Sequence, residues 1–314
     1  MPSGLSWLLR TLPVLKSLAS ADRQVVVRTE TSAAPLLQLS GIDPCPLVWS
    51  EDQAVHQADP FQEAFLLHNT LADAWWAWRQ GIARRWGYRG HWNRWLLSPA
   101  VPRPRGPLPV DERFHALLTA AGVPMVEPAG SWLQLPPELV KKGQRRLARA
   151  KITVGDSPLV GLYAGNQGSG SGGPWPRQDF LEVLRQMRRR HPHWRFVILA
   201  TVRDLWVAVR LHEDTGKIHP VIGPDLDSVG LAGLMSHLDL VVAGDSWLLQ
   251  LAAACGAATV GLLAAPRGTW ALKPDQHISV ISPGSSLAPI EVEAVLTACD
   301  TLAAARSIDQ RLLE

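Results

Sequence analysis

The stretch from Asp239 to Pro266, DLVVAGDSWLLQLAAACGAATVGLLAAP, constrains the fold of this chain more than any other. Two short apolar runs within it, at 240–243 and 258–263, predict buried strands. Between them, Ser246 is placed to cap a helix over 247–255, whose small and apolar residues can pack closely on a sheet. A strand, a helix and a second strand in this order form the repeating unit of an open parallel sheet.

The same alternation runs through most of the 314 residues. We expect further strands at 24–28, 45–49, 64–68, 159–163, 195–200, 221–222 and 278–281. We expect helices at 5–19, 33–39, 71–80, 111–121, 138–150, 176–191, 203–211, 228–236 and 289–305. The alternation pauses near 151–157 and then restarts, and the length is too great for one small core. The sequence therefore predicts an α/β protein with one domain at 1–152 and a second at 153–314.

The bulk composition limits the possible functions. Hydrophobic residues make up 46% of the chain and charged residues 19%, which is typical of a globular protein with a core. The net charge of +3 is compatible with a phosphorylated small molecule or an anionic membrane surface, and it is too weak to indicate nucleic acid. Three cysteines without metal-ligand spacing predict free thiols in a reducing cytoplasm. The sequence shows no signal peptide and no apolar run long enough to span a bilayer.

Two segments of the second half have the features of anion sites. The loop at 164–173, AGNQGSGSGG, has glycines that let backbone N–H groups approach a phosphate, although it matches neither a Walker loop nor a dinucleotide fingerprint. Asp245 and Ser246 lie where a strand ends and a helix begins, so free N–H groups and the helix dipole meet there. The plainer alternatives are a surface linker and an ordinary helix cap. Because ligands of open sheets bind beyond the carboxyl ends of strands, we expect both segments to face one diphosphate.

Two segments of the first half are rich in positive charge. Residues 82–97, IARRWGYRGHWNRWLL, form either a solvated sheet edge or a basic, aromatic wall for an anionic acceptor. The helix at 138–150 carries basic side chains that form either a solvated face or a surface for a membrane or another anionic partner. Some of the 14 tryptophans can stack on sugar rings.

Several short motifs of these segments occur together in one known family. They are, in chain order, Asn69-Thr70, Arg85–Tyr88, Arg94, Leu96-Leu97, Ala164–Asn166, Trp175-Pro176, Asp245-Ser246, Ala252–Gly256 and Thr259-Val260. In this arrangement the chain resembles the heptosyltransferase-like glycosyltransferases, which form glycosyltransferase family 9. The resemblance is strongest in the second half.

The resemblance implies a GT-B architecture, in which two Rossmann-like, doubly wound domains face each other across a cleft. Domain 1–152 would bind the acceptor and domain 153–314 the nucleotide-sugar donor, with the last helix near the seam between them. The implied reaction is inverting, metal-independent transfer of heptose or a similar sugar from a nucleotide-diphosphate donor such as an ADP-sugar. The acceptor would be a lipopolysaccharide core or another cell-envelope glycan or glycolipid. No cofactor is implied, and the protein would work in the cytoplasm, with peripheral association at the inner face of the cytoplasmic membrane.

The same resemblance implies the site residues. Those expected to bind the donor are Gly165, Asn166, Gly168, Ser169, Trp175, Asp245, Ser246 and Gln250. Those expected to bind the acceptor are Asn69, Arg85, Tyr88 and Arg94. No metal ligand is expected.

Four positions depart from the family pattern. They are Trp7 in place of the aspartate that acts as general base, Gly173 in place of a lysine, Trp247 in place of a glycine and Gln250 in place of a histidine. A tryptophan cannot accept a proton, so the catalytic residue is unassigned. The candidate substitutes are His68, Asp73 and His91. The alternatives to a glycosyltransferase are a non-catalytic relative that binds nucleotide or glycan, and a nucleotide-sugar epimerase of the same architecture.

Overall fold

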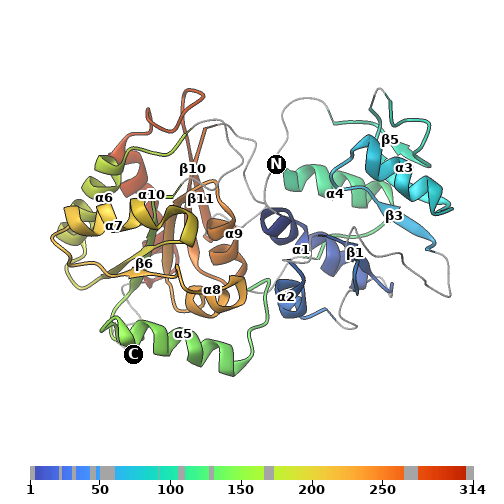
Figure 1. Cartoon of the computed structure of the whole chain (residues 1–314). Coiled ribbons are helices and arrows are strands. Elements are labelled where there is room, and N and C mark those ends of the chain that lie inside the picture. Colours follow the sequence, from blue (N-terminus) through green and yellow to red (C-terminus); the bar gives the residue numbers. More distant parts are fainter. Residues whose placement is uncertain are drawn as a thin grey trace.

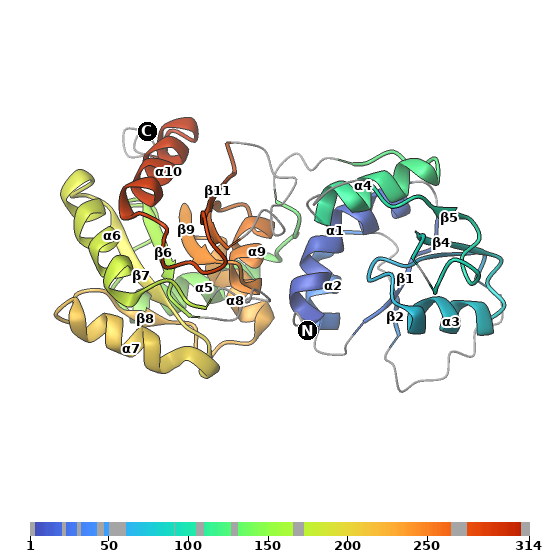
Figure 2. The same ribbon diagram turned by 90° about the horizontal axis from the view of Figure 1, so that it is seen from above.

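The structure of the protein is a computed structural model, and it describes residues 4–20, 23–29, 33–42, 47–49, 61–90, 92–104, 110–126, 131–165, 173–264 and 275–308. Figure 1 shows two α/β bodies side by side, one built from the first part of the chain and one from the second. Figure 2 shows the same two bodies from above. The predicted α/β class with two Rossmann-like domains is confirmed.

The second domain is built on one sheet of six parallel strands. The strands are β6 (Leu159–Tyr163), β7 (Arg195–Leu199), β8 (Val221–Ile222), β9 (Leu240–Gly244), β10 (Ala258–Leu263) and β11 (His277–Ile281). Their spatial order is β8-β7-β6-β9-β10-β11, which is the 3-2-1-4-5-6 order of the Rossmann fold. The order therefore reverses between β6 and β9, where such folds bind their ligands.

Helices cover both faces of this sheet, and alternate strand residues point to opposite faces. Val160 and Leu162 of β6 belong to the core beneath α6 (Arg177–Arg190), α7 (Leu205–Asp214) and α10 (Val292–Ala305), and the short helix η3 (Val202–Asp204) leads into α7. Leu159 and Tyr163 belong to the core beneath α8 (Ser228–Met235) and α9 (Trp247–Ala254). Because both faces are buried, these strands are continuous apolar runs rather than alternating ones.

The first domain begins with α1 (Gly4–Ser20) and has two small parallel sheets. One pairs β1 (Val26–Arg28) with β2 (Leu47–Trp49), and the other orders β3 (Glu63–Phe65), β4 (Arg84–Tyr88) and β5 (Ala100–Val101). The helices are α2 (Ala34–Leu37), which continues into η2 (Gln38–Ser40), then α3 (Leu71–Arg79) and α4 (Val110–Ala120). In the described part of the chain α1 is the first element.

The two domains share one apolar core. Leu8, Leu9 and Leu12 of α1 lie in the same buried cluster as Leu248 and Leu251 of α9. Helix α1 packs against α9, and α2 packs against α8. The face of the second sheet that carries α8 and α9 is therefore the face that meets the first domain.

Two helices lie elsewhere than expected. The last helix, expected near the seam between the domains, instead packs against α6 on the opposite face of the sheet from α9. The reason is that Val295, Leu296 and Leu302 complete the core over β10 and β11 there. Helix α5 (Pro137–Arg149) precedes the predicted boundary, yet it packs along α8 of the second domain. The boundary between 152 and 153 stays a prediction.

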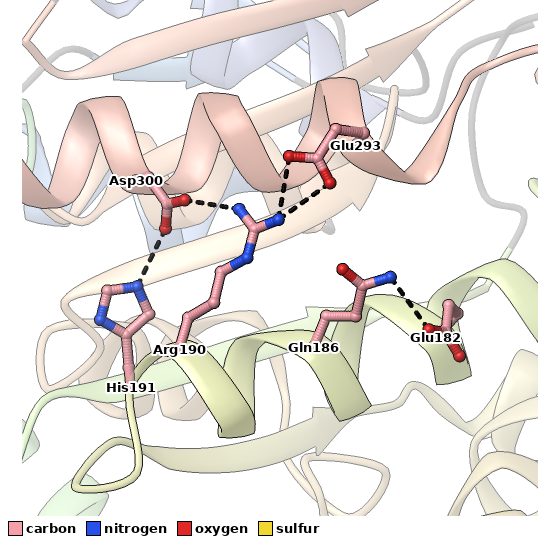
Figure 3. Close-up of polar contacts among 6 residues, drawn as sticks. All are labelled: Glu182, Gln186, Arg190, His191, Glu293 and Asp300. Atoms are coloured by element: carbon pink, nitrogen blue, oxygen red, sulfur yellow. Dashed lines mark hydrogen bonds and ion pairs between the residues drawn. The ribbon is translucent and has the colours of Figure 1, made fainter.

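A group of charged side chains clamps α10 to α6 (Figure 3). Arg190 donates to both oxygens of Glu293, at 2.9 and 2.8 Å, and to Asp300 at 2.7 Å. The ring of His191 lies 2.9 Å from the other oxygen of Asp300. These contacts are partly exposed and fix the position of α10 on the far side of the sheet from the first domain.

The close contact between α5 and α8 yields a stability prediction. A Cβ atom added at Gly143 would lie 2.0 Å from the carbonyl oxygen of Gly233, which is backbone and cannot move aside alone. In Gly143→Ala, the higher helix propensity of alanine stabilises the protein by about 1 kcal/mol, whereas overpacking by the new Cβ atom destabilises it by about 1–3 kcal/mol. We expect a net loss of free energy of unfolding, measured by urea denaturation. The control Gln144→Ala changes the neighbouring exposed position, and equal stability of the two variants would contradict this packing.

Candidate donor site at the seam between the domains

The two predicted anion segments follow neighbouring strands at the switch point of the second sheet. Strands β6 and β9 are neighbours, with Tyr163 beside Ala243 in the register, so the chain leaves both strands at the same edge. Gly165 follows β6 and Asp245 follows β9. Gly165 and Asp245 thus lie at the same edge of the sheet, and their role in binding a diphosphate stays a prediction, whereas Asn166, Gly168 and Ser169 lie outside the described residues.

The start of the loop after β6 is held by a buried hydrogen-bond group. The Tyr163 hydroxyl donates to Asp204, and the other oxygen of Asp204 accepts from Thr201 N at 2.7 Å and Thr201 Oγ1 at 3.0 Å. Burial, together with the neighbouring carboxylate, raises the pKa of Tyr163, so the phenol stays a donor. A Cβ atom at Gly165 would lie 2.1 Å from Asp204 Oδ2. Glycine is required at this position by the packing of the protein itself.

The start of α9 is capped as the sequence predicts. Ser246 has extended backbone angles, and its hydroxyl accepts from Leu249 N at 3.3 Å. Ser246 is buried, and so is Trp247, the first residue of the helix. The amino end of α9 therefore lies inside the protein, beneath α1 of the first domain.

Asp245 forms an ion pair across the seam. Its Oδ1 accepts from Nη2 of Arg10 at 2.8 Å, and the side chains are 8% exposed for Arg10 and 24% exposed for Asp245. Gln250 joins this pair, because its amide oxygen, in the orientation that satisfies its neighbours, accepts from Arg10 Nε and Nη2 at 2.8 Å each. In that orientation its amide nitrogen donates to the carbonyl of Ser6 at 2.8 Å. Two predicted donor residues thus bind one arginine of the other domain.

Arg10 and Ser6 are the site residues that sequence reasoning missed. Arg10 is the one charged side chain among the buried residues of α1. A buried arginine needs a partner, so its position was a signal for a carboxylate elsewhere in the chain. The sequence could not say which carboxylate it meets, because Arg10 and Asp245 are 235 positions apart.

Trp175 lies in the core rather than at a surface. Its indole N–H donates to the carbonyl of Ile290 at 3.1 Å, and its ring meets the edge of Phe180 at a centroid distance of 4.9 Å. The side chain is buried in the cluster beneath α6 and α10. With 2% of its surface exposed, Trp175 presents no open ring face.

Trp7, at the position expected for the general base, contacts a histidine. The centroids of Trp7 and His68 lie 4.3 Å apart in an edge-on arrangement, and Phe114 packs on the other side at 6.1 Å. His68 is exposed and lies three residues after the end of β3. Asp73, another candidate base, is paired with Arg28 at 3.3 Å, and His91 lies outside the described residues.

The residues expected to bind the acceptor mostly hold backbone. Arg85 donates to the carbonyls of Leu96 at 2.5 Å and Ala83 at 3.1 Å, and also to Ile82. Asn69 donates to the Tyr88 carbonyl at 2.8 Å, and the buried Tyr88 hydroxyl donates to the Arg113 carbonyl. Burial raises the pKa of Tyr88. Arg94, in contrast, is exposed, with its guanidinium 4.3 Å from the ring centroid of Trp95.

Two further observations on the described residues concern metal binding and membrane-spanning helices. Within the described ranges, no three histidine, cysteine, aspartate or glutamate side chains gather as a metal site would require. No helix in that part of the chain has both the length and the apolar character to cross a membrane.

The ion pair across the seam gives a second stability prediction. In Asp245→Asn the shape is kept and the buried Arg10 loses its counter-charge, which costs about 3 kcal/mol. The control is Asp73→Asn, which breaks the more exposed pair with Arg28 and should cost about 1 kcal/mol or less. Urea denaturation of both variants checks the difference. Similar losses would show that the seam does not depend on Asp245.

The family model for glycosyltransferase family 9 (heptosyltransferase) matches residues 55–281. The search of curated proteins found no match.

Solved structures share the fold at low sequence identity. The family 9 glycosyl transferase from Veillonella parvula has a TM-score of 0.78 at 16% identity, covering 96% of this chain and 94% of its own. E. coli ADP-heptose lps heptosyltransferase II has a TM-score of 0.71 at 17% identity, covering 98% of each chain. E. coli heptosyltransferase WaaC with ADP-2-deoxy-2-fluoro heptose has a TM-score of 0.68 at 14% identity, and the match covers 95% of this chain and 96% of the WaaC chain. These likenesses show the GT-B architecture, and the family model, which spans most of the chain, shows that this protein belongs to glycosyltransferase family 9.

Proposed function

We propose that this protein transfers heptose or a similar sugar from a nucleotide-diphosphate donor to a lipopolysaccharide-core or other cell-envelope glycan. The observation that carries the proposal is that β6 and β9, which precede the two predicted anion segments, end side by side at the switch point of the second sheet. Ligands of Rossmann-like sheets bind at this point. Membership of family 9 supplies the reaction class.

The donor proposal starts from this edge of the sheet. Gly165 and Asp245 lie there, together with Arg10 from the first domain. A guanidinium matches the geometry of a diphosphate, so Arg10 supplies the positive charge that the lysine replaced by Gly173 would have given. Among the neighbours, E. coli WaaC is described with ADP and with an ADP-heptose analogue, which favours ADP-sugars as the first donors to test.

The reaction that we propose is inverting and needs neither metal nor cofactor. A group of the first domain must take the proton from the acceptor hydroxyl. His68 is the favoured candidate, because it contacts Trp7, which stands where the family aspartate is expected. Trp7 lies three residues before Arg10 on α1, so the residue that His68 contacts and the arginine of the donor edge are neighbours on that helix. An imidazole nitrogen can accept a proton, unlike the indole of Trp7.

The acceptor and its place in the cell complete the proposal. An acceptor built on the lipopolysaccharide core is a glycolipid, so transfer would take place at the inner face of the cytoplasmic membrane. Arg94 is the one predicted acceptor residue that the structure shows exposed and turned away from the backbone. Asn69, Arg85 and Tyr88 would then shape the wall behind the acceptor rather than touch it.

A non-catalytic relative that binds nucleotide or glycan is the second candidate. It is favoured by one observation, namely that Asp245 and Gln250 are already bound by Arg10 and Ser6. If these contacts persist when a nucleotide is present, the protein has turned its donor site into a fixed seam between domains.

Calorimetry and turnover distinguish the two candidates. We expect the protein to bind one nucleoside diphosphate of a panel and to hydrolyse or transfer the matching nucleotide-sugar. Arg10→Met should weaken nucleotide binding because the diphosphate loses a charged partner, at a cost of about 2 kcal/mol. Arg28→Met, which removes an arginine of the first domain elsewhere, is the control. Binding without turnover on all donors would leave only the non-catalytic candidate.

His68 gives the test of the proposed base. His68→Ala should lower kcat by about 10²–10⁴-fold and leave donor affinity unchanged, because general-base catalysis acts on the acceptor proton. The control is His115→Ala, an exposed histidine on α4. Both are measured in the transfer assay with the donor that calorimetry identifies. Equal kcat in the two variants would remove His68 from the mechanism without affecting the donor proposal.

A further inference from the structure

Helix α7, with the short helix η3 before it, carries an apolar stripe that faces solvent. We call it the α7 stripe, and it consists of four side chains that are each more than a third exposed, namely Val202, Leu205, Trp206 and Val209. Trp206 is 72% exposed. Ala208 and Leu211 are buried on the core side of the same helix. The side of a surface helix that faces away from the core is normally polar, so the α7 stripe is an exception.

The spacing of these residues places them on one side of the helix. Trp206, Val209 and Glu213 follow one another at intervals of three and four positions, which brings their side chains into one row along α7. Val202 precedes Trp206 by four positions and extends the row at the amino end. Exposed apolar side chains that form a continuous group generally mark a contact surface.

Opposite charges lie at the two ends of the α7 stripe. Arg203 is exposed at the amino end, where the helix dipole is also positive. Glu213 is exposed at the carboxyl end. The neighbouring Asp214 is bound by Arg177 at 2.7 Å, whereas Glu213 has only a looser contact of 3.9 Å with Arg210 among the printed ion pairs of the described residues. The stripe is therefore an apolar strip with one positive and one negative end.

The place of α7 in the fold leaves the stripe accessible to another molecule. Figures 1 and 2 both show α7 on the second domain, on the side that is remote from the first domain. Helix α7 packs on α6 and on β8, which is the edge strand of the six-stranded sheet. The buried Asp204, at the start of the same segment, holds the loop after β6. A molecule on the α7 stripe therefore does not cover the seam between the domains.

We propose that the α7 stripe joins two copies of this chain about a two-fold axis. In such a dimer the two α7 helices lie antiparallel, with Trp206 and Val209 of each copy at the centre. Arg203 and Glu213 lie about equally far from this centre on opposite sides, so each Arg203 meets the Glu213 of the other copy. Each Glu213 also lies near the positive end of the other helix dipole. The apolar and the charged parts of the stripe are thus both self-complementary.

Other occupants fit the α7 stripe less well. A parallel pair of helices would bring Glu213 beside Glu213, and like charges at a contact are repulsive. An anionic bilayer would likewise repel Glu213 and Asp214, which are both exposed. One pair of helices makes a contact that is small beside the roughly 1,200–2,000 Å² of stable interfaces. We therefore expect a reversible dimer that dissociates on dilution.

Sedimentation velocity of the full chain, at concentrations from about 1 µM to about 1 mM, tests the proposal. We expect the mass to rise with concentration from that of one 34.3 kDa chain toward that of two. The double variant Trp206→Ser/Val209→Ser should raise the dissociation constant of the dimer at least about tenfold, because four apolar side chains lose their contacts. The matched control is Trp95→Ser in the first domain, a tryptophan that is 77% exposed, and its dissociation constant should equal that of the unchanged protein.

Charge reversal tests the antiparallel arrangement. Arg203→Glu and Glu213→Arg should each raise the dissociation constant by roughly fivefold to tenfold, because two ion pairs of the dimer become repulsive. The double variant Arg203→Glu/Glu213→Arg restores opposite charges and should return the constant to within about twofold of the original. Failure of this double variant to recover the affinity would overturn the two-fold arrangement.

Two results of the sedimentation experiment would overturn the dimer itself. One is the mass of a single chain at every concentration. The other is a dimer that Trp206→Ser/Val209→Ser leaves intact, or that Trp95→Ser weakens by the same factor. The experiment uses no nucleotide, so its failure is separate from failure of the proposed transfer.

Discussion

The ion pair between Arg10 and Asp245 is the interaction on which the donor edge of this protein depends. A guanidinium buried at the seam has a high desolvation cost, and it is tolerated only because Asp245 and Gln250 complete its hydrogen bonds. The partners come from different domains, so neither domain alone satisfies these groups. The apolar contact of α1 with α9 lies beside the pair, in which the guanidinium is buried more deeply than the carboxylate. The same ion pair therefore contributes both to the relative position of the domains and to the electrostatics of the site.

This arrangement explains why the departures from the family pattern occur together. A bulky tryptophan is accommodated at position 247 because the start of α9 is buried. At position 250, the amide oxygen of glutamine accepts from Arg10, and a histidine has no such oxygen. Trp7, on the same helix, fills space against His68 and Phe114. Three of the four substituted positions therefore lie on α1 and α9, the helices that pack across the seam, and a nucleotide would have to compete with or join the contacts of Arg10.

The first domain divides its aromatic and basic residues into two groups. Arg85 and Tyr88 turn inward and hold backbone carbonyls, which gives short strands and long connections a fixed shape. The tryptophans at 75, 78, 92 and 95 turn outward. Inward-facing residues of this kind are what a small domain needs when its sheets have only two and three described strands.

The sequence by itself determined the elements and their order. The strands at 159–163, 221–222 and 258–263 have the predicted bounds, because a buried parallel strand is a local run of apolar residues that ends where polar or glycine residues follow. The Ser246 cap and the placement of Gly165 and Asp245 at one edge of the sheet also follow from local rules and strand topology. Only the tertiary structure decided that α5 packs on α8, that α10 lies away from the seam, and that Arg10 meets Asp245. These outcomes depend on which surfaces are complementary across hundreds of residues, and hydrophobic periodicity contains no information about that.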